Sequence, residues 1–381
     1  MTVFMPRLIG AALASALLLA APVPAEAKGT STLVAERGNF YVGGRDVERD
    51  SSIVRIQSMF VEYMIPARRT RKTPIVLVHG NYQSGAGFLS TPDGRSGWAE
   101  RFLRAGYAVY IVDQPMRGRS PYHPETDGPA SVMTAAQLER LFTAPDPATS
   151  APQTKLHTQW PGTGRAGDPV FEQFRASQQP SVQGPADKID AIVRSAVNDL
   201  LHKIGPAVVL THSRAGTFGW EAADDAPELV KAVIAIEPNG PPFFNPDGAD
   251  GKEPATRARP WGVTYDHMTF DPPVASPDEI RIEREKKADG PDLLPCWLQK
   301  DTPRTLPHLA KVPVLIVVGE ASYHAPYDHC TARFLKQAGV PVTFMRLEDK
   351  GIRGNGHMMM LERNSDAIAD QLVGWLNKTA H

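Results

Sequence analysis

The sequence predicts an α/β protein with a mostly parallel, doubly wound sheet. Apolar runs of strand length, such as residues 73–79 and 107–113, are typical of parallel strands that helices cover on both faces. Helical segments lie between these runs, and a strand–helix–strand order requires right-handed crossovers within one sheet. We therefore expect strands at residues 54–63, 73–79, 107–113, 206–211, 231–236, 312–318 and 340–347, and helices at residues 98–105, 189–204, 214–223, 327–338 and 366–376.

Local composition supports these elements in chain order. Residues 54–63 alternate roughly and are rich in β-branched and aromatic side chains, which is typical of a strand. Gly106 follows the first expected helix, and glycine is common just past a helix end. Residues 189–204 place apolar side chains at helical spacing, so an amphipathic helix is expected before the strand at 206–211.

Two long stretches interrupt this alternation. Residues 121–185 are rich in Pro, Gly, Ser and Thr, and only Val132–Phe142 looks helical. Residues 238–310 are also irregular. Because compact domains rarely contain structureless loops this long, we expect two insertions that form a cap over the carboxyl ends of the strands. The core of this cap is expected to include the aromatic side chains of the second insertion, which are Phe243, Phe244, Trp261, Tyr265 and Trp297.

The N-terminus predicts export. Arg7 precedes an apolar run at residues 8–21, and Ala25-Glu26-Ala27 fits a cleavage site. The run is too short for a stable membrane anchor, so we expect a signal peptide at residues 1–27 and a periplasmic or secreted domain at residues 28–381. An oxidising compartment would permit a disulfide between the two cysteines, Cys296 and Cys330, although two separate buried thiols stay equally open.

Composition argues against charged macromolecular partners. The formal net charge is -1, which excludes the strongly basic classes that bind nucleic acid or anionic membranes. The sequence leaves a homodimer open. No metal ion or other cofactor is expected, because no second cluster with ligand spacing accompanies the sequence neighbours His324, Asp328, His329 and Cys330.

Ser213 lies where the strand at 206–211 passes directly into a helix. A nucleophile elbow occupies this position in the α/β-hydrolase fold, where a sharp strained turn exposes the Ser Oγ and the helix N-terminus favours developing negative charge. Thr211 and Ala215 replace the glycines of the usual Gly-x-Ser-x-Gly pattern. Helix capping is the alternative role for a Ser here, but the strand–turn–helix context favours Ser213 as the nucleophile.

Two further groups complete the expected site. The backbone N–H groups of Asn81, in the turn after strand 73–79, and of Arg214, after the nucleophile, are expected to form the oxyanion hole. His357 follows the last expected strand in a glycine-rich loop, which is the place of the catalytic base. Spacing leaves the acid open, since Glu237 ends the strand after the elbow helix, whereas Glu320 and Asp328 follow the next strand, the commoner place.

Several blocks of the sequence resemble an unusual subfamily of exported bacterial α/β-hydrolase esterases. They are His79-Gly80 with Thr91–Trp98, Ala235–Pro238 and Gly354–Met360, and Asp113-Gln114, Arg117–Ser120 and His212-Ser213 fit as well. The resemblance covers the core from about Arg37 to the end. It implies a Ser–Glu–His triad whose acid follows the strand after the elbow, and the matching residue is Glu237.

This chain departs from the resembling family at two positions. Adjacent cysteines are expected just after the His-Gly turn, where Asn81-Tyr82 stands, so no redox role of such a pair carries over. Gln is expected after the nucleophile, where Arg214 would bring a positive charge near the acyl pocket. The second insertion also looks longer, so the family's substrate preference does not carry over either.

The expected function is hydrolysis of carboxylic esters through an acyl-enzyme intermediate, with Ser213, Glu237 and His357 as the catalytic residues. An amidase, a lactonase or a carbon–carbon hydrolase could use the same triad. Outside enzymes, the alternative is a binding protein with a disabled site. The near-neutral chain and its aromatic cap favour uncharged, moderately apolar esters as substrates.

Overall fold

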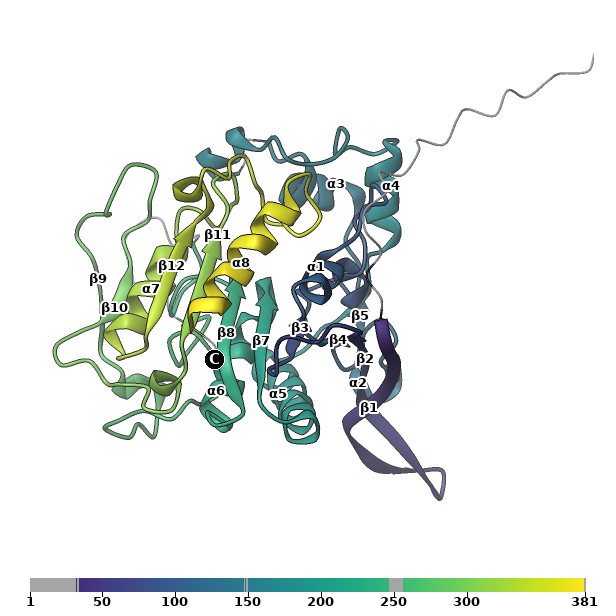
Figure 1. Cartoon of the computed structure of the whole chain (residues 1–381). Helices are drawn as coiled ribbons and strands as arrows, with labels where there is room; N and C mark the ends of the chain where they lie inside the picture. The colour runs from purple at the N-terminus through teal and green to yellow at the C-terminus, as the bar shows by residue number, and fades with distance from the viewer. Residues whose placement is uncertain (1–31, 33, 147, 149, 247–255, 380–381) are drawn as a thin grey trace, which may run out of the picture. The chain divides into compact units, whose positions relative to one another are not determined.

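Figure 1 shows the computed structural model, which describes residues 32, 34–146, 148, 150–246 and 256–379. The predicted signal peptide lies outside these residues. The predicted fold class is confirmed by an eight-stranded sheet with the order β1-β2-β4-β3-β7-β8-β11-β12. Its strands are β1 (Val34–Arg49), β2 (Ser52–Pro66), β3 (Ile75–Val78), β4 (Val109–Asp113), β7 (Ala207–His212), β8 (Val230–Ile236), β11 (Val314–Val318) and β12 (Val342–Arg346).

Strand direction follows the predicted α/β pattern. Neighbouring strands from β4 to β12 are parallel, whereas β2 pairs antiparallel with both β1 and β4. The longer helices connect the parallel strands, as right-handed crossovers require. The helices are α1 (Trp98–Arg104), α2 (Pro124–Asp127), α3 (Ala135–Leu138), α4 (Pro169–Ala176), α5 (Ala186–Ile204), α6 (Gly216–Asp225), α7 (Asp328–Gln337) and α8 (Ser365–Thr379).

The two faces of the sheet carry separate hydrophobic cores. Val76 and Val78 of β3 pack with residues of α5, α6 and α7 on one face. Ile75 and Leu77 of the same strand pack with residues of α1 and α8 on the other face. Because successive side chains of a strand point to opposite faces, burial on both faces produces the continuous apolar runs of the sequence.

The two insertions extend these two cores. The first insertion (121–185) contains α2, α3 and α4 and the short strands β5 (Ala130–Ser131) and β6 (Ser181–Val182), and its Phe171 and Phe174 join the α1/α8 core. Figure 1 shows α3 and α4 of this insertion at the top, near the end of the sheet where β11 terminates. That this insertion caps the carboxyl ends of the strands stays a prediction.

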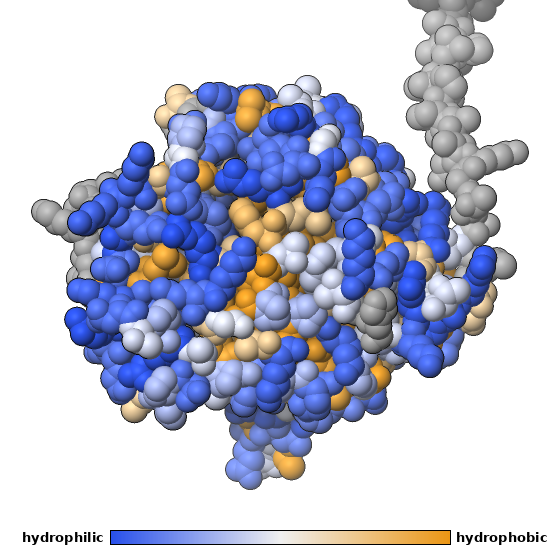
Figure 2. Space-filling model, turned by 60° about the vertical axis from the view of Figure 1, so that its left-hand side comes forward, coloured by the Kyte–Doolittle hydropathy of each residue, from blue (hydrophilic) through white to orange (hydrophobic). Residues whose placement is uncertain are grey.

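The second insertion is described at residues 238–246 and 256–310. It contains the short strands β9 (Ile282–Arg284) and β10 (Trp297–Gln299) beside α7, and its buried Phe243 and Phe244 join the α5/α6/α7 core. These two aromatic side chains thus belong to the core on one face of the sheet, whereas the sequence analysis expected them in the core of a cap. Figure 2 turns this side of the molecule forward and shows apolar side chains in a central area surrounded by polar residues.

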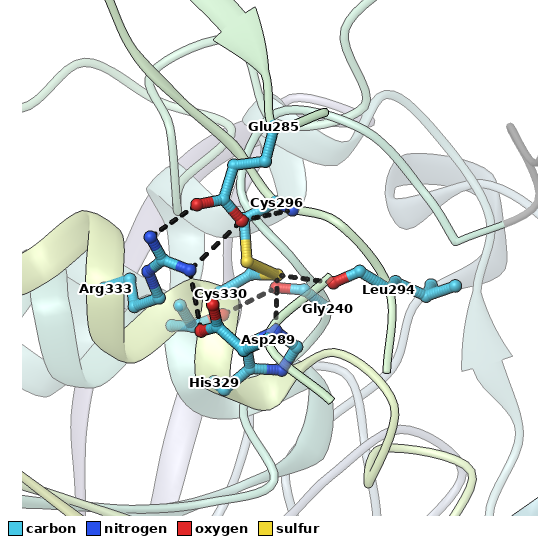
Figure 3. The surroundings of a disulfide bond; sticks show 9 residues. Gly240, Glu285, Asp289, Leu294, Cys296, His329, Cys330 and Arg333 are labelled. Carbon is cyan, nitrogen blue, oxygen red and sulfur yellow. Dashed lines mark hydrogen bonds and ion pairs between the residues drawn. A yellow bond between two sulfur atoms is a disulfide. The ribbon is translucent and has the colours of Figure 1, made fainter. Parts of the chain in front are cut away.

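A disulfide joins Cys296, just before β10, to Cys330 in α7, so the first of the two alternatives for these cysteines is correct (Figure 3). Arg333 of α7 adds ion pairs to Glu285 and Asp289 of the second insertion. The bond and the ion pairs fasten the second insertion to the helix that covers the sheet. No helix in the described part of the chain is long and apolar enough to span a membrane.

Removing this disulfide is expected to destabilise the fold. The bond closes a loop with a sequence separation of 34 residues, and the loss of such a cross-link costs about 3–4 kcal/mol of unfolding free energy in the chain-entropy model. The variant with Cys296→Ser and Cys330→Ser should therefore unfold at lower urea concentration than the wild type. Added reductant should lower the midpoint of the wild type alone. Equal midpoints for both proteins would contradict the expectation.

Candidate active site

Ser213 occupies a strained turn between β7 and α6. Its backbone φ angle of 56° lies in the left-handed region, which residues other than glycine rarely adopt. A turn of 3₁₀ helix (Ser213–Ala215) then leads into α6. A Cβ on Gly216 would collide with Pro238, so the close approach of α6 to the end of β8 requires a residue without a side chain. This strand–turn–helix arrangement, which we call the elbow, is the local structure expected around Ser213, and the role of Ser213 as a nucleophile stays a prediction.

The turn after β3 contacts Ser213 directly. A Cβ on Gly80 would lie 2.9 Å from Ser213 Cβ, so only glycine permits this approach. The Gly80 carbonyl accepts hydrogen bonds from His79 Nδ1 at 2.8 Å and Arg117 Nη1 at 3.3 Å. The backbone N–H of Gln114 donates to His79 Nε2, which leaves the proton on Nδ1. Burial and the neighbouring Arg117 lower the pKa of His79 to about 4, so the ring is neutral at physiological pH.

The structure brings His357 and Glu237 together. His357 Nδ1 lies 2.6 Å from Glu237 Oε2, and the two side chains are 2% and 0% exposed. Glu237 follows β8 directly and accepts two more hydrogen bonds, from the backbone N–H of Gly319 at 2.8 Å and from Ser322 Oγ at 2.6 Å. Three donors thus surround this carboxyl group.

The two alternative acids have other partners. Glu320 forms an ion pair with Arg353 and accepts a hydrogen bond from the backbone N–H of Gly354. Asp328 lies 2.9 Å from His324 Nδ1. Neither carboxylate contacts His357 among the hydrogen bonds and ion pairs of the described residues, so the geometry favours Glu237.

Aromatic rings enclose His357. The ring centroid of His212, which directly precedes Ser213, lies 4.6 Å away, and that of Tyr323 lies 4.8 Å away. Ser213 lies close enough to Tyr323 to act on the pKa of its hydroxyl group, so the serine and the histidine have this tyrosine as a common neighbour. His324 stacks on His357 at 4.7 Å, and Phe142 of the first insertion stacks on it at 5.6 Å.

Hydrogen bonds to the buried Glu362 stabilise the loop that carries His357. Glu362, fully buried, accepts hydrogen bonds from the backbone N–H of Gly356 at 2.9 Å and from Asn355 Nδ2 at 2.7 Å. Its Oε1 lies 2.6 Å from Nε2 of His157, which belongs to the first insertion. No sequence pattern points to Glu362, because only the folded chain places this acid next to the loop and beside His157.

Burial has the largest effect on the pKa values of His357 and Glu237. It lowers the pKa of His357 well below the usual value for histidine, and the nearby His212 and His324 lower it further. Burial also raises the pKa of Glu237 to about 8, although Ser322 and Gly319 favour its charged form. The ionised carboxylate beside the neutral imidazole is therefore the form that prevails at alkaline pH.

The Arg214 side chain differs from its expected role. Its guanidinium pairs with Asp190 of α5, with one contact at 3.2 Å, and lies 4.2 Å from the ring centroid of Tyr265. The positive charge expected near an acyl pocket is therefore compensated. The physical reason is that α5 places a fully buried carboxylate opposite the first turn of the elbow helix, a proximity that sequence alone does not reveal.

Within the part of the chain that the structure describes, two groups of side chains have the spacing of metal ligands. Glu237, His324 and His357 each place one ligand atom within 4.8 Å of the others, but Glu237 and His357 are hydrogen-bonded to each other. In the second group, Cys296 and Cys330 accompany His329, and their sulfur atoms are bonded to each other. In each group, at least two of the three side chains are therefore already bonded to each other.

Comparison with known proteins identifies the family of the chain. Residues 75–371 match the Alpha/beta hydrolase family. The chain is 44% identical over 343 residues to a protein named "Probable secreted lipase phiG" from Fungal sp. (strain ATCC 74256), covering 89% of each chain. A solved bacterial esterase has a similar fold, with a TM-score of 0.61 and 24% identity over 94% of this chain and 100% of its own. The 44% identical relative is fungal, whereas the sequence resemblance pointed to a bacterial subfamily, and the chain belongs to the alpha/beta hydrolase family.

Proposed function

We propose that this protein is a serine hydrolase that cleaves carboxylic esters through an acyl-enzyme intermediate. The observation that carries the proposal is the 2.6 Å hydrogen bond between His357 and Glu237, next to an elbow that holds Ser213 at a positive φ. The relative named as a probable secreted lipase supports an ester as the substrate. Ser213 is the nucleophile, His357 the general base and acid, and Glu237 the residue that orients the imidazole.

The reaction follows from the tautomer that Glu237 selects. An ionised Glu237 accepts the Nδ1 proton of His357, which leaves the Nε2 lone pair to take the proton of Ser213 as its oxygen attacks the ester carbonyl. The imidazolium then protonates the leaving alcohol as the carbon–oxygen bond breaks. A water molecule, deprotonated by the same histidine, attacks the acyl-enzyme and releases the carboxylic acid and free Ser213.

The oxyanion of each tetrahedral intermediate is held by the backbone N–H groups of Asn81 and Arg214. His79 and Arg117 bind the Gly80 carbonyl. Since the C=O and N–H of a trans peptide point in opposite directions, these contacts fix the orientation of the Asn81 N–H. The donor is therefore positioned before the substrate binds, which is the condition for electrostatic stabilisation of the oxyanion.

The same proposal includes export. Residues 1–27 have the pattern of a signal peptide, and the relative with 44% identity is named as secreted. The disulfide between Cys296 and Cys330 supports an oxidising compartment.

A matched panel of p-nitrophenyl esters and p-nitroanilides of varied acyl length tests the reaction class. The mature protein should hydrolyse the esters and act far more slowly on the anilides of the same acyl groups. Faster hydrolysis of the anilides would indicate an amidase, and no turnover of either series would contradict the proposal.

The pH dependence of kcat/KM should reflect the titration of Glu237 beside His357. Protonated Glu237 would donate to Nδ1, so the remaining ring proton would sit on Nε2 and His357 could not accept the Ser213 proton. Because the pKa of Glu237 is raised to about 8, kcat/KM for a neutral ester should rise with pH and be half-maximal near this value. The rising limb should be lost in Glu237→Gln, which has no carboxyl group to titrate. A wild-type profile that is flat from neutral to alkaline pH would refute this assignment.

A further inference from the structure

A cavity of about 170 Å³ lies beside the proposed oxyanion hole. Asn81 and Arg214, the two residues proposed to hold the oxyanion, line one part of it. Arg117 and other polar residues line another part, and the apolar side chains of Ile189 and Phe218 also belong to the wall. A water molecule occupies about 30 Å³ in the liquid, so this cavity has room for several non-hydrogen atoms of a substrate.

Arg117 is a buried cation without a counter-ion. Its side chain is 7% exposed, and its hydrogen-bond partners are the neutral Gly80 carbonyl at 3.3 Å and Ser181 Oγ at 2.8 Å. No carboxylate of the described residues forms an ion pair with it, and the neighbouring cation of Arg214 disfavours its charged form and lowers its pKa further below the value that burial sets. Burial of an unpaired charge is costly, so a guanidinium in this position favours an anion in the adjoining cavity.

Two other arginines, the half-buried Arg214 and the buried Arg259, show how this chain satisfies a guanidinium elsewhere. Arg214 pairs with Asp190, so its charge is already compensated. Arg259 donates to three carbonyl oxygens, those of Pro241, Phe244 and the Asn245 side chain. Arg117 has only two neutral acceptors and faces a cavity.

We propose that this cavity is a subsite for a carboxylate group of the ester substrate, bound by the Arg117 guanidinium. A planar guanidinium binds a carboxylate through two parallel N–H···O hydrogen bonds, which gives both charge compensation and orientation. The apolar wall of Ile189 and Phe218 would pack against the short carbon chain that joins this carboxylate to the ester. This inference rests on the proposed function and replaces the expectation of uncharged esters.

Matched ester pairs test the subsite in two arms. The acyl arm compares the mono-p-nitrophenyl ester of adipic acid with p-nitrophenyl hexanoate. The alcohol arm compares 4-acetoxybenzoate with its methyl ester. In at least one arm, the ratio of kcat/KM for the charged over the neutral ester should be roughly tenfold to a hundredfold higher in the wild type than in Arg117→Met. The arm that shows this difference identifies the side of the ester that carries the carboxylate.

Two control variants separate charge recognition from structure. Arg117→Lys keeps the charge but loses the planar fork, so its ratio should be intermediate. Arg119→Met removes a cation two residues away that pairs with Asp113 and Glu62, and its ratio should equal that of the wild type. If Arg117 only positions the Gly80 carbonyl, Arg117→Met will lower kcat/KM for both esters of a pair equally, which would overturn the proposal.

Calorimetry distinguishes failure of the subsite from failure of the proposed function. If the wild type hydrolyses no ester, titration with adipate and with 4-hydroxybenzoate still tests the cavity. Saturable binding of either anion that is lost in Arg117→Met and kept in Arg119→Met supports the subsite. Absent binding, or equal binding to the wild type and Arg117→Met, contradicts it.

Discussion

Ser213→Ala should lower kcat for p-nitrophenyl esters by roughly 10⁴-fold or more, because the loss of a catalytic serine removes the covalent pathway. The residual rate should reflect binding and the oxyanion donors alone. Far-UV circular dichroism should be unchanged, because alanine occupies the same turn with a smaller side chain. Ser177→Ala, at the end of α4 and outside the site, is the matched control and should keep full activity.

A small effect of Ser213→Ala on kcat would show that another group is the nucleophile. If Ser213→Ala keeps more than about one-hundredth of the wild-type kcat, Ser213 is not the nucleophile. The strained φ of 56° at Ser213 would then need another explanation. The contact of Gly80 with Ser213 would likewise be a packing feature with no part in holding an oxyanion.

Glu237→Ala should lower kcat by roughly 10³-fold to 10⁴-fold. Without the carboxylate, His357 loses the acceptor that holds its Nδ1 proton and stabilises the imidazolium. Glu320→Ala and Asp328→Asn should lower kcat far less, since these side chains contact Arg353 and His324 and not His357. The reverse ranking would refute the assignment of Glu237.

The structural and electrostatic roles of Glu237 can be separated. Glu237→Gln keeps the size of the side chain and one acceptor oxygen, which can still receive the hydrogen bond from the backbone N–H of Gly319. A loss of kcat in this variant as large as that in Glu237→Ala, with an unchanged unfolding midpoint, would indicate that the carboxylate charge is needed. Recovery of kcat in Glu237→Gln would instead indicate a role limited to packing.

Much of the fold could be predicted because strands that are buried on both faces of the sheet appear as continuous apolar runs in the sequence. The apolar run at 73–79 contains β3 and the run at 206–211 overlaps β7, with ends displaced by one or two residues. β1 was missed because it lies at the sheet edge, is mostly exposed and pairs only with β2, so it has no apolar pattern. α4 was also missed, although Asp168 caps it and Pro169 begins it, both common signals of a helix start.

The candidate site was predictable only where a residue's role depends on its place in the topology. Ser213, Glu237 and His357 follow strand ends, and parallel strands bring these ends to one edge of the sheet. Tyr323 and Phe142 contact His357 across long sequence separations, and nothing in their local sequence indicates this contact. The same holds for Arg117, whose lack of a counter-ion is visible only after every neighbour is in place.

Labelling of the mature protein with a fluorophosphonate probe tests the central claim most directly. The probe bonds covalently to an activated serine oxygen, and peptide mapping identifies the serine. Our account predicts one adduct, on Ser213, which is absent in Ser213→Ala and forms much more slowly in Glu237→Ala. No adduct on the wild type, or an adduct that persists unchanged in Ser213→Ala, would contradict it.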